Sequence, residues 1–371
     1  MDDQIKLEID PATLRTWLEE GQAVKVIDIR PPADFEEWHI PGSENVYAYH
    51  ALYARQPGPL ADYHPPKGEP VVAVCYSGNT SKVAANYLRS RGINALSLMG
   101  GMQWWSLAWN RAKVPLEKSS AQVIQIRRTG KGCLSYMIAS QGEALVIDPS
   151  VNAEIYQSLA NENNWKITKV VDTHVHADHL SRGRSLAELT EAIFYLPQQD
   201  RVSFPYEPLH PEDTLAIGEA NLSVLATPGH TFESICLLLD EEALFTGDTL
   251  FPTSIGRPDL KADRKGTEKR THALYNSLEA LVKLPEDTLI LAGHTGEPIA
   301  FDESPIMASI GKALEDIAII KSSEKDFVAT VLKNIPATPP NHLQIVKYNE
   351  AGVLPAGDVS VLEAGANRCA L

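Results

Sequence analysis

The first 113 residues alternate short apolar runs with stretches in which apolar residues recur at helical spacing. Three apolar runs predict buried strands, and these lie at residues 24–29, 71–74 and 95–98. One helix is predicted to begin at the cap-and-proline pair Asp10-Pro11, and a second covers residues 81–91. Short strands that alternate with helices are typical of a small α/β domain with a mostly parallel sheet, which we expect over residues 1–113.

Residues 119–371 contain more short apolar runs and predict a second, larger α/β domain that ends in a helical extension. The expected strands lie at residues 123–126, 134–138, 144–147, 193–196, 214–217, 222–225, 235–239, 243–245 and 289–291. The expected helices lie at residues 150–161, 271–283, 304–321 and 325–333. The segment between the two domains, 110–120, is polar and is predicted to be a short linker.

Charge and composition narrow the classes of function. The chain of 371 residues carries a formal net charge of −15 without a basic run, which argues against nucleic acid or an anionic membrane as a partner. An acidic start and the lack of a long apolar run predict neither a signal peptide nor a membrane span. Four widely spaced cysteines make a disulfide framework unexpected, so we expect a cytoplasmic protein.

Three histidines and one aspartate stand within six residues after the apolar run 167–171. They are His174, His176, Asp178 and His179. A loop at the end of a strand can gather these side chains without any helix geometry. Imidazole suits Zn, Fe, Cu and Ni, and a carboxylate shifts the preference toward Fe or Zn. This loop therefore predicts a metal site.

Three further candidate ligands each follow an apolar run and have a glycine beside them. They are His230, Asp248 and His294. A lone Gly-His or Gly-Asp pair indicates only a turn. In this order, behind the His-x-His-x-Asp-His loop, they resemble the metallo-β-lactamase superfamily from about residue 120 to the C-terminus. The resemblance implies a sandwich of two sheets with outer helices.

Cys75 lies between a predicted strand and a predicted helix, where backbone N–H groups and the helix dipole favour an anion. A cysteine phosphatase would need an arginine six residues later, and this chain has Ser81 there. The loop resembles the rhodanese (sulfurtransferase) family, which implies that Cys75 accepts a sulfane sulfur. Asp28 and Arg30 would be structural in that family. The residues expected to contact the substrate are Ser77, Gly78, Asn79, Thr80 and Ser81.

The resemblance of the second domain extends to persulfide dioxygenases, and this implies a single iron held by His174, His230 and Asp248. Fe(II) is the expected metal and Zn the alternative. The second set of residues, which would orient ligands or bind a second metal, is His176, Asp178, His179 and His294. Cys75 and Asp178 are the candidate catalytic residues. Fusion with a sulfurtransferase supports this interpretation, because both domains would act on a persulfide.

The expected partners are small molecules. They are glutathione persulfide or a related small thiol or persulfide, O₂, and sulfite or thiosulfate, and a homodimer stays open as an assembly. Arg257 could pair with a glutathione carboxylate or only brace its loop with Asp259. Arg182 stands where persulfide dioxygenases usually have a small residue, so it is either at the substrate entrance or a solvated surface residue.

Two other functions remain open. The same ligands could hold two metal ions in a thioester hydrolase resembling glyoxalase II, in which a bridging hydroxide would be the nucleophile. A non-enzymatic module for persulfide sensing or sulfur relay is the third hypothesis. The remaining histidines and cysteines are expected to be structural, and they are Cys133, His210, Cys236, His272, His342 and Cys369. The last two belong to segments that resemble the tail of bacterial persulfide dioxygenases.

Overall fold

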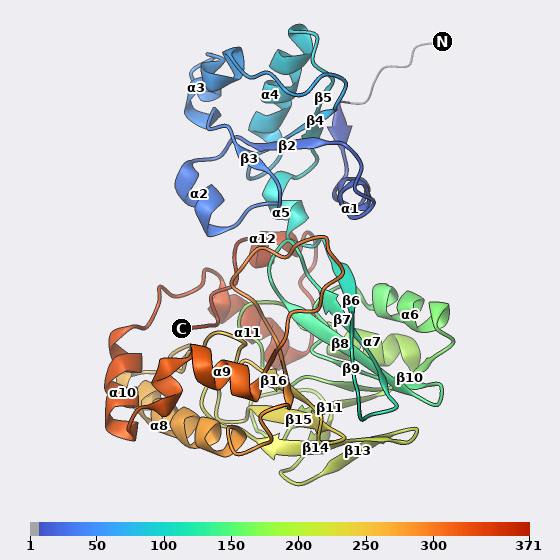
Figure 1. Ribbon diagram of the computed structural model, residues 1–371, viewed down its shortest axis with the longest axis vertical. Helices are drawn as coiled ribbons and strands as arrows, with labels where there is room; N and C mark the ends of the chain where they lie inside the picture. Colours follow the sequence, from blue (N-terminus) through green and yellow to red (C-terminus); the bar gives the residue numbers. More distant parts are fainter. Residues whose placement is uncertain (1–6) are drawn as a thin grey trace.

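The computed structural model describes residues 7–371, and its N-terminal domain is built on one five-stranded sheet in the order β1-β5-β4-β2-β3 (Figure 1). Every neighbouring pair is parallel, as the sequence predicted. The strands are β1 (Glu8–Ile9), β2 (Lys25–Asp28), β3 (Glu44–Asn45), β4 (Val71–Val74) and β5 (Ala95–Leu98). The helices are α1 (Pro11–Glu19), α2 (Pro32–Glu37), α3 (Tyr49–Tyr53), η1 (Gly58–Ala61), α4 (Asn79–Ser90) and α5 (Gly101–Trp105).

Helices cover both faces of this sheet because alternate strand residues point to opposite sides. Ala73 on β4 belongs to the cluster formed with Leu88 of α4. Its neighbour Val74 belongs to the opposite cluster, with Leu14 of α1 and Trp105 of α5. The apolar runs of the sequence are therefore strands buried on both faces.

The second domain is a sandwich of two sheets. The seven-stranded sheet has the order β12-β11-β10-β9-β8-β7-β6, and the six-stranded sheet has the order β13-β14-β15-β16-β17-β18. The first sheet consists of β6 (Asn110–Val114), β7 (Gln122–Arg127), β8 (Leu134–Ser140), β9 (Glu143–Ile147), β10 (Lys166–Val171), β11 (Ile193–Pro197) and β12 (Glu207–Leu209). The second consists of β13 (Thr214–Ile217), β14 (Ala220–Ala226), β15 (Ile235–Leu239), β16 (Ala243–Gly247), β17 (Leu289–Ala292) and β18 (Ala308–Ser309).

One core lies between the sheets, where Tyr136 of β8 packs edge-on against Phe245 of β16 with ring centroids 4.9 Å apart. The outer face of the first sheet is covered by α6 (Ala153–Glu162) and α7 (Gly183–Thr190). The outer face of the second is covered by α8 (Arg264–Leu281), α9 (Ile310–Asp316), η2 (Ala318–Lys321) and α10 (Glu324–Lys333). This arrangement confirms the predicted sandwich with outer helices.

The segment that was predicted to be a linker is largely a strand. Asn110–Val114 forms β6, which pairs antiparallel with β7 at the edge of the seven-stranded sheet. The prediction of a linker over 110–120 is wrong for these residues, because Ala112 and Val114 alternate inward while Arg111 and Lys113 face solvent. That alternation is typical of an edge strand with one buried face.

The C-terminal segment contains α11 (His342–Ala351) and α12 (Ser360–Glu363). Of these, α12 lies where the two domains meet and contacts α5 of the first domain (Figure 1). Trp104 in α5 donates its indole N–H to Asp358 Oδ2 at 2.8 Å. Within residues 7–371, no helix is long and apolar enough to cross a membrane.

Candidate metal centre and cysteine loop

The candidate metal ligands come from loops that follow four strands. His174, His176, Asp178 and His179 follow β10, whereas His230, Asp248 and His294 follow β14, β16 and β17. Each of these side chains is at most 3% exposed. The glycine beside Asp248 is required for geometry, since Gly247 has φ +47° and a Cβ there would lie 2.5 Å from Thr173 Oγ1. The fold therefore assembles in one buried place all seven residues that the sequence predicted.

The first ligand group is His174, His230 and Asp248, whose donor atoms all lie within 4.8 Å of one another. The two Nε2 atoms lie 3.8 and 3.6 Å from Asp248 Oδ2. His230 donates from Nδ1 to the carbonyl of Arg257 at 2.8 Å, which leaves Nε2 with its lone pair facing the group. Burial lowers the pKa of both His174 and His230, so both are neutral near pH 7.

Buried polar atoms of this group lack partners, and this is the feature that fits a metal ion. His174 Nε2 and Asp248 Oδ2 have no hydrogen-bond partner among the described residues. Burial alone would raise the pKa of Asp248, but His294, His230 and His174 lower it below its usual range. A buried carboxylate oxygen and a neutral imidazole nitrogen left unpaired would be costly without a cation between them. Two imidazoles and one carboxylate are a donor set that Fe(II) and Zn accept.

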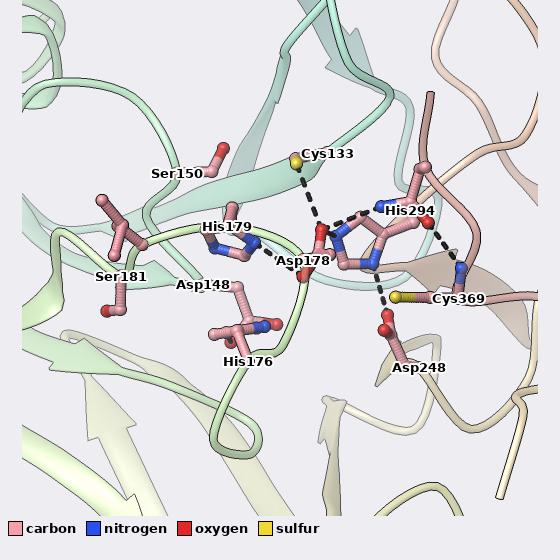
Figure 2. Close-up of polar contacts among 12 residues, drawn as sticks. Cys133, Asp148, Ser150, His176, Asp178, His179, Ser181, Asp248, His294 and Cys369 are labelled. Carbon is pink, nitrogen blue, oxygen red and sulfur yellow. Dashed lines mark hydrogen bonds and ion pairs between the residues drawn. The ribbon is translucent and has the colours of Figure 1, made fainter. Parts of the chain in front are cut away.

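The second ligand group is Cys133, Asp178, His179 and His294, again with donor atoms within 4.8 Å of one another (Figure 2). His294 Nε2 lies 2.6 Å from Asp178 Oδ2, and His179 Nδ1 lies 3.1 Å from Asp178 Oδ1. On its other side, His294 Nδ1 lies 2.5 Å from Asp248 Oδ1. His294 therefore links the two groups into one centre.

Charges in the second group shift the pKa values of its members. Burial lowers the pKa of His294, but the Asp178 and Asp248 carboxylates outweigh burial and hold it well above its usual range. Burial and Asp178 raise the pKa of the Cys133 thiol, but His179 and His294 outweigh both and bring it to about 6. A thiol in this environment is readily converted to thiolate.

His176 lies outside both groups. Its Nε2 is 3.2 Å from Asp148 Oδ1, and with Asp172 these residues form a separate cluster beside His174. Asp148 also accepts hydrogen bonds from the backbone N–H and the hydroxyl of Thr173, at 2.7 and 2.8 Å. Asp148 thus fixes the start of the metal loop through Thr173. His176 helps to orient the loop through its contact with Asp148.

Several residues at the centre were missed by sequence reasoning. Cys133 and Cys369 were expected to be structural; both are buried, but both lie among metal-ligand candidates. Asn349 of α11 donates to the carbonyls of His176 and His179, at 2.9 Å each, and Asn367 donates to Asp178 Oδ2 at 2.8 Å. Cys236 lies in an apolar cluster, as expected. The sequence Asn367-Arg368-Cys369 could have pointed to these residues, but only the fold shows that the C-terminal tail lies against the metal centre.

Arg182 and Arg257 do not face a substrate entrance. Arg182 is 2% exposed and pairs with Glu363 at 2.9 Å, so neither the substrate-contact nor the surface interpretation fits. Arg257 is fully buried, pairs with Asp259 at 2.8 Å and donates to the carbonyls of residues 336, 337 and 368. Its guanidinium braces the loop against the C-terminal tail, which was the alternative role.

The other histidines also have local roles: His272 pairs with Glu324 at 2.7 Å on the surface, and His342 contacts the carbonyl of Pro339.

A cavity of about 690 Å³ adjoins the centre. His294 reaches its wall, and Asn367, Arg368 and Ala370 of the C-terminal tail form one side. The lining also includes Phe251 and the stretch from residue 295 to residue 300. Small-molecule sites typically have volumes of roughly 300–1,000 Å³, so this cavity is large enough for a tripeptide thiol.

The Cys75 loop lies in the first domain between β4 and α4. Cys75 is 1% exposed, and its sulfur accepts a hydrogen bond from the backbone N–H of Ser81 at 3.3 Å. The hydroxyl of Ser81 lies 3.3 Å from the same sulfur. Gly78 turns the loop with φ +82°, while Ser77 and Asn79 are exposed and Thr80 is partly buried. Among the predicted loop residues, Ser81 is the one that contacts the thiol directly.

The expected structural role of Asp28 and Arg30 fits the geometry. The two side chains form a buried ion pair at 2.7 Å, and Arg30 also donates to the carbonyl of Trp38. Close packing also fixes the loop at Gly101, where an added Cβ would lie 2.2 Å from the carbonyl oxygen of Cys75. The Cys75 loop is thus held by close backbone packing against Gly101 rather than by charged side chains.

Two protein families match this chain. Residues 10–108 match the rhodanese-like domain, and residues 128–294 match the metallo-beta-lactamase superfamily. The chain joins a rhodanese-like domain to a metallo-beta-lactamase domain. Together the matched ranges contain Cys75 and all seven of the metal-ligand candidates that the sequence predicted.

Solved structures similar to the metallo-beta-lactamase domain include two that are 28% identical in sequence. A metallo-beta-lactamase from Staphylococcus aureus subsp. aureus COL has a TM-score of 0.58 and covers 64% of this chain and 74% of its own. ETHE1 from Myxococcus xanthus has a TM-score of 0.54 and covers 62% of this chain and 97% of its own.

A curated relative is the hydroxyacylglutathione hydrolase of Polaromonas sp. (strain JS666), which is 35% identical over 168 residues. The alignment covers 43% of this chain and 61% of that hydrolase, so the chain spans about three-fifths of the relative's length. An uncharacterized protein of Aquifex aeolicus is 28% identical over 214 residues, which are 52% of this chain and 98% of that protein.

Proposed function

We propose that the chain is a sulfur-metabolism enzyme that oxidises a low-molecular-weight persulfide, such as glutathione persulfide, to sulfite, and that transfers sulfane sulfur through Cys75. The observation that carries this proposal is the combination, in one chain, of a buried group of two histidines and one aspartate with the cysteine loop of a rhodanese-like domain. A persulfide is a chemical species on which both sites could act.

His174, His230 and Asp248 would hold the metal, with Fe(II) the expected ion and Zn the alternative. A two-histidine, one-carboxylate set leaves coordination positions open, and iron bound there would supply the activation of O₂ and of the substrate sulfur. The carbonyl of Arg257 keeps His230 in the tautomer that presents Nε2. Asp178 Oδ2 lies 2.6 Å from His294 Nε2 and would orient that imidazole beside the metal.

Glutathione persulfide would occupy the cavity next to His294. Neither Arg182 nor Arg257 would contact its carboxylates, because both guanidinium groups are occupied by buried acids or carbonyls. The polar wall of the cavity instead includes Arg127 and Arg368, which pair with Asp302 and Glu37. Arg127 is 1% exposed and its guanidinium is occupied in the same way, by Asn110, Asp302 and the carbonyl of Ala300, so the partly exposed Arg368 is the candidate carboxylate contact.

In the first domain, the Cys75 thiolate would attack the terminal sulfur of the persulfide donor. A Cys75–S–SH group forms, the donor's S–S bond breaks, and the donor leaves as a thiolate. A second thiol then takes the sulfur and restores Cys75. Residues 75–81 contain no cation, and this favours a persulfide over thiosulfate as the donor.

A thioester hydrolase is the second candidate function. It is supported by the second ligand group, which lies directly beside the first: His294 Nδ1 of the second group lies 2.5 Å from Asp248 Oδ1 of the first. The similarity to a hydroxyacylglutathione hydrolase supports it as well. In this reaction two bound ions would supply a hydroxide at neutral pH.

Oxygen uptake by the iron-loaded full chain on addition of glutathione persulfide separates the two reactions. We expect uptake in proportion to sulfite formed, and loss of both in the His230→Ala variant. The Cys75→Ser variant is the matched control, because it lies in the other domain and should keep oxygen uptake. No uptake by a sample with measured iron, together with hydrolysis of a glutathione thioester, would reject the oxidation in favour of the hydrolase.

A further inference from the structure

Two cysteines approach the metal centre from opposite sides (Figure 2). Cys133 precedes β8, and its sulfur lies 3.5 Å from Asp178 Oδ2. Cys369 belongs to the C-terminal tail and lies with Asp248 and His294, all three donor atoms within 4.8 Å of one another. Both thiols are fully buried.

Each thiol shares a candidate ligand group with a residue that has a buried polar atom without a hydrogen-bond partner in the described part of the chain. In the group of Cys133 this atom is Nε2 of His179, a side chain that is 1% exposed. In the group of Cys369 it is Oδ2 of Asp248, which is 2% exposed. Nitrogen, oxygen and sulfur donors that converge while buried polar atoms among them stay unpaired are arranged as metal ligands are.

The tail that carries Cys369 is fixed in place. The backbone N–H of Arg257 donates to the carbonyl of Cys369 at 3.1 Å, and that of Leu371 donates to the carbonyl of Ile255 at 2.9 Å. Asn367 connects the same tail to Asp178 at 2.8 Å and to the N–H of Cys369 at 2.8 Å. These hydrogen bonds fix the position of the Cys369 thiol.

We propose that the metal centre of this chain is ligated by protein thiolates, with Cys133 completing the group of Asp178, His179 and His294, and Cys369 adding a sulfur donor beside Asp248. Each thiol loses its proton to solvent on binding the ion, as thiol ligands do. Sulfur donors favour a thiophilic divalent ion such as Zn²⁺ or Fe²⁺ over Mg²⁺ or Ca²⁺. The proposal concerns the ligands alone: the group of Cys133, Asp178, His179 and His294 would hold a second ion beside the one bound by His174, His230 and Asp248.

Cobalt(II) is a direct probe, because a thiolate bound to cobalt gives a charge-transfer absorption in the near ultraviolet that nitrogen and oxygen ligands do not give. The full-length chain would be stripped with a chelator and titrated with Co²⁺. We expect the absorption in the parent protein, a loss of about half of it in each of Cys133→Ser and Cys369→Ser, and its absence in the double variant. Each single variant should also bind Co²⁺ more weakly by at least ~10-fold in competition with a chelator.

Cys236→Ser is the matched control. Cys236 is as buried as the two candidates, but it bonds to Thr227 at 3.3 Å within an apolar cluster and belongs to none of the ligand groups. It should keep the full absorption. An absorption that survives in the double variant would overturn the proposal, and one that only a single variant removes would overturn the assignment of the other cysteine. These results do not depend on catalysis, so they are distinguishable from a failure of the proposed reaction.

Discussion

Glu363 of α12 provides a sharp test of how the C-terminal segment supports the metal loop. Its carboxylate pairs with Arg128 at 3.2 Å and with Arg182 at 2.9 Å, and all three side chains are at most 2% exposed. It also accepts the backbone N–H of Leu180 at 2.7 Å, directly after His179. Glu363→Gln keeps the shape of the side chain but leaves two buried guanidinium groups without a counter-charge.

Removal of one partner from a buried ion pair typically costs about 3–5 kcal/mol. For a domain of this size, a loss of 1 kcal/mol lowers the melting temperature by roughly 2–4 °C, so we expect the second domain to melt about 6–20 °C lower. Calorimetry on the full chain measures this, with Glu162→Gln as the control. Glu162 pairs with Arg111 at 2.8 Å but is about half exposed, so its loss should cost less than ~1 kcal/mol.

The pH dependence of the melting temperature is a second test of the role of Glu363. Burial raises the pKa of Glu363, but Arg128 and Arg182 outweigh burial and lower it far below its usual range. A carboxyl with a lowered folded-state pKa stabilises the fold above the unfolded value of about 4.3, and this contribution falls away as the pH drops below it. The difference between parent and Glu363→Gln should therefore narrow in acid. An equal melting temperature at pH 7, or a gap that widens in acid, would refute the reasoning.

Three further predictions concern the two sites. Cys75→Ser should abolish sulfur transfer and leave the metal content unchanged; a loss of metal, measured by mass spectrometry, would show that the domains depend on each other. His230→Ala should weaken metal binding by more than ~100-fold, since loss of even an outer partner costs roughly 10–100-fold, while alkylation of Cys75 proceeds as before. Gly101→Ala should slow sulfur transfer by at least ~10-fold, because its Cβ would collide with the carbonyl of Cys75; an unchanged rate would mean that the loop tolerates displacement.

Much of the fold was predictable because its signals are local. Strands buried on both faces, such as Val71–Val74, are continuous apolar runs, and glycines mark the turns after the strands that carry Asp248 and His294. The segment 110–114 was missed because three of its five side chains are polar or charged, which is also the composition of a linker. Only its pairing partner, β7, decides that it is a strand.

Four of the metal-ligand candidates were predictable because they share one loop, and the other three because each follows a strand with a glycine beside it. Cys133, Asn367 and Cys369 could not be found in that way, since no sequence spacing relates them to His294. The substrate contacts expected of Arg182, and of Arg257 in one of its two expected roles, do not fit the structure for a related reason. An arginine near a site suggests a substrate contact. Only the tertiary structure shows that Arg182 is paired with Glu363 and Arg257 with Asp259.

The C-terminal segment connects features that are far apart in the sequence. Asp358 accepts the indole N–H of Trp104 in the first domain, and Arg368 pairs with Glu37 of the same domain. Between these two contacts, Glu363 supports the metal loop and Asn367 reaches the metal centre, and Cys369 reaches it directly after Arg368. The two domains are therefore held by a segment that also forms part of the site. A substitution that breaks the contacts of this segment should therefore affect both the placement of the rhodanese-like domain and the binding of metal. If the domains were independent and joined only by a flexible linker, one substitution would not have both effects.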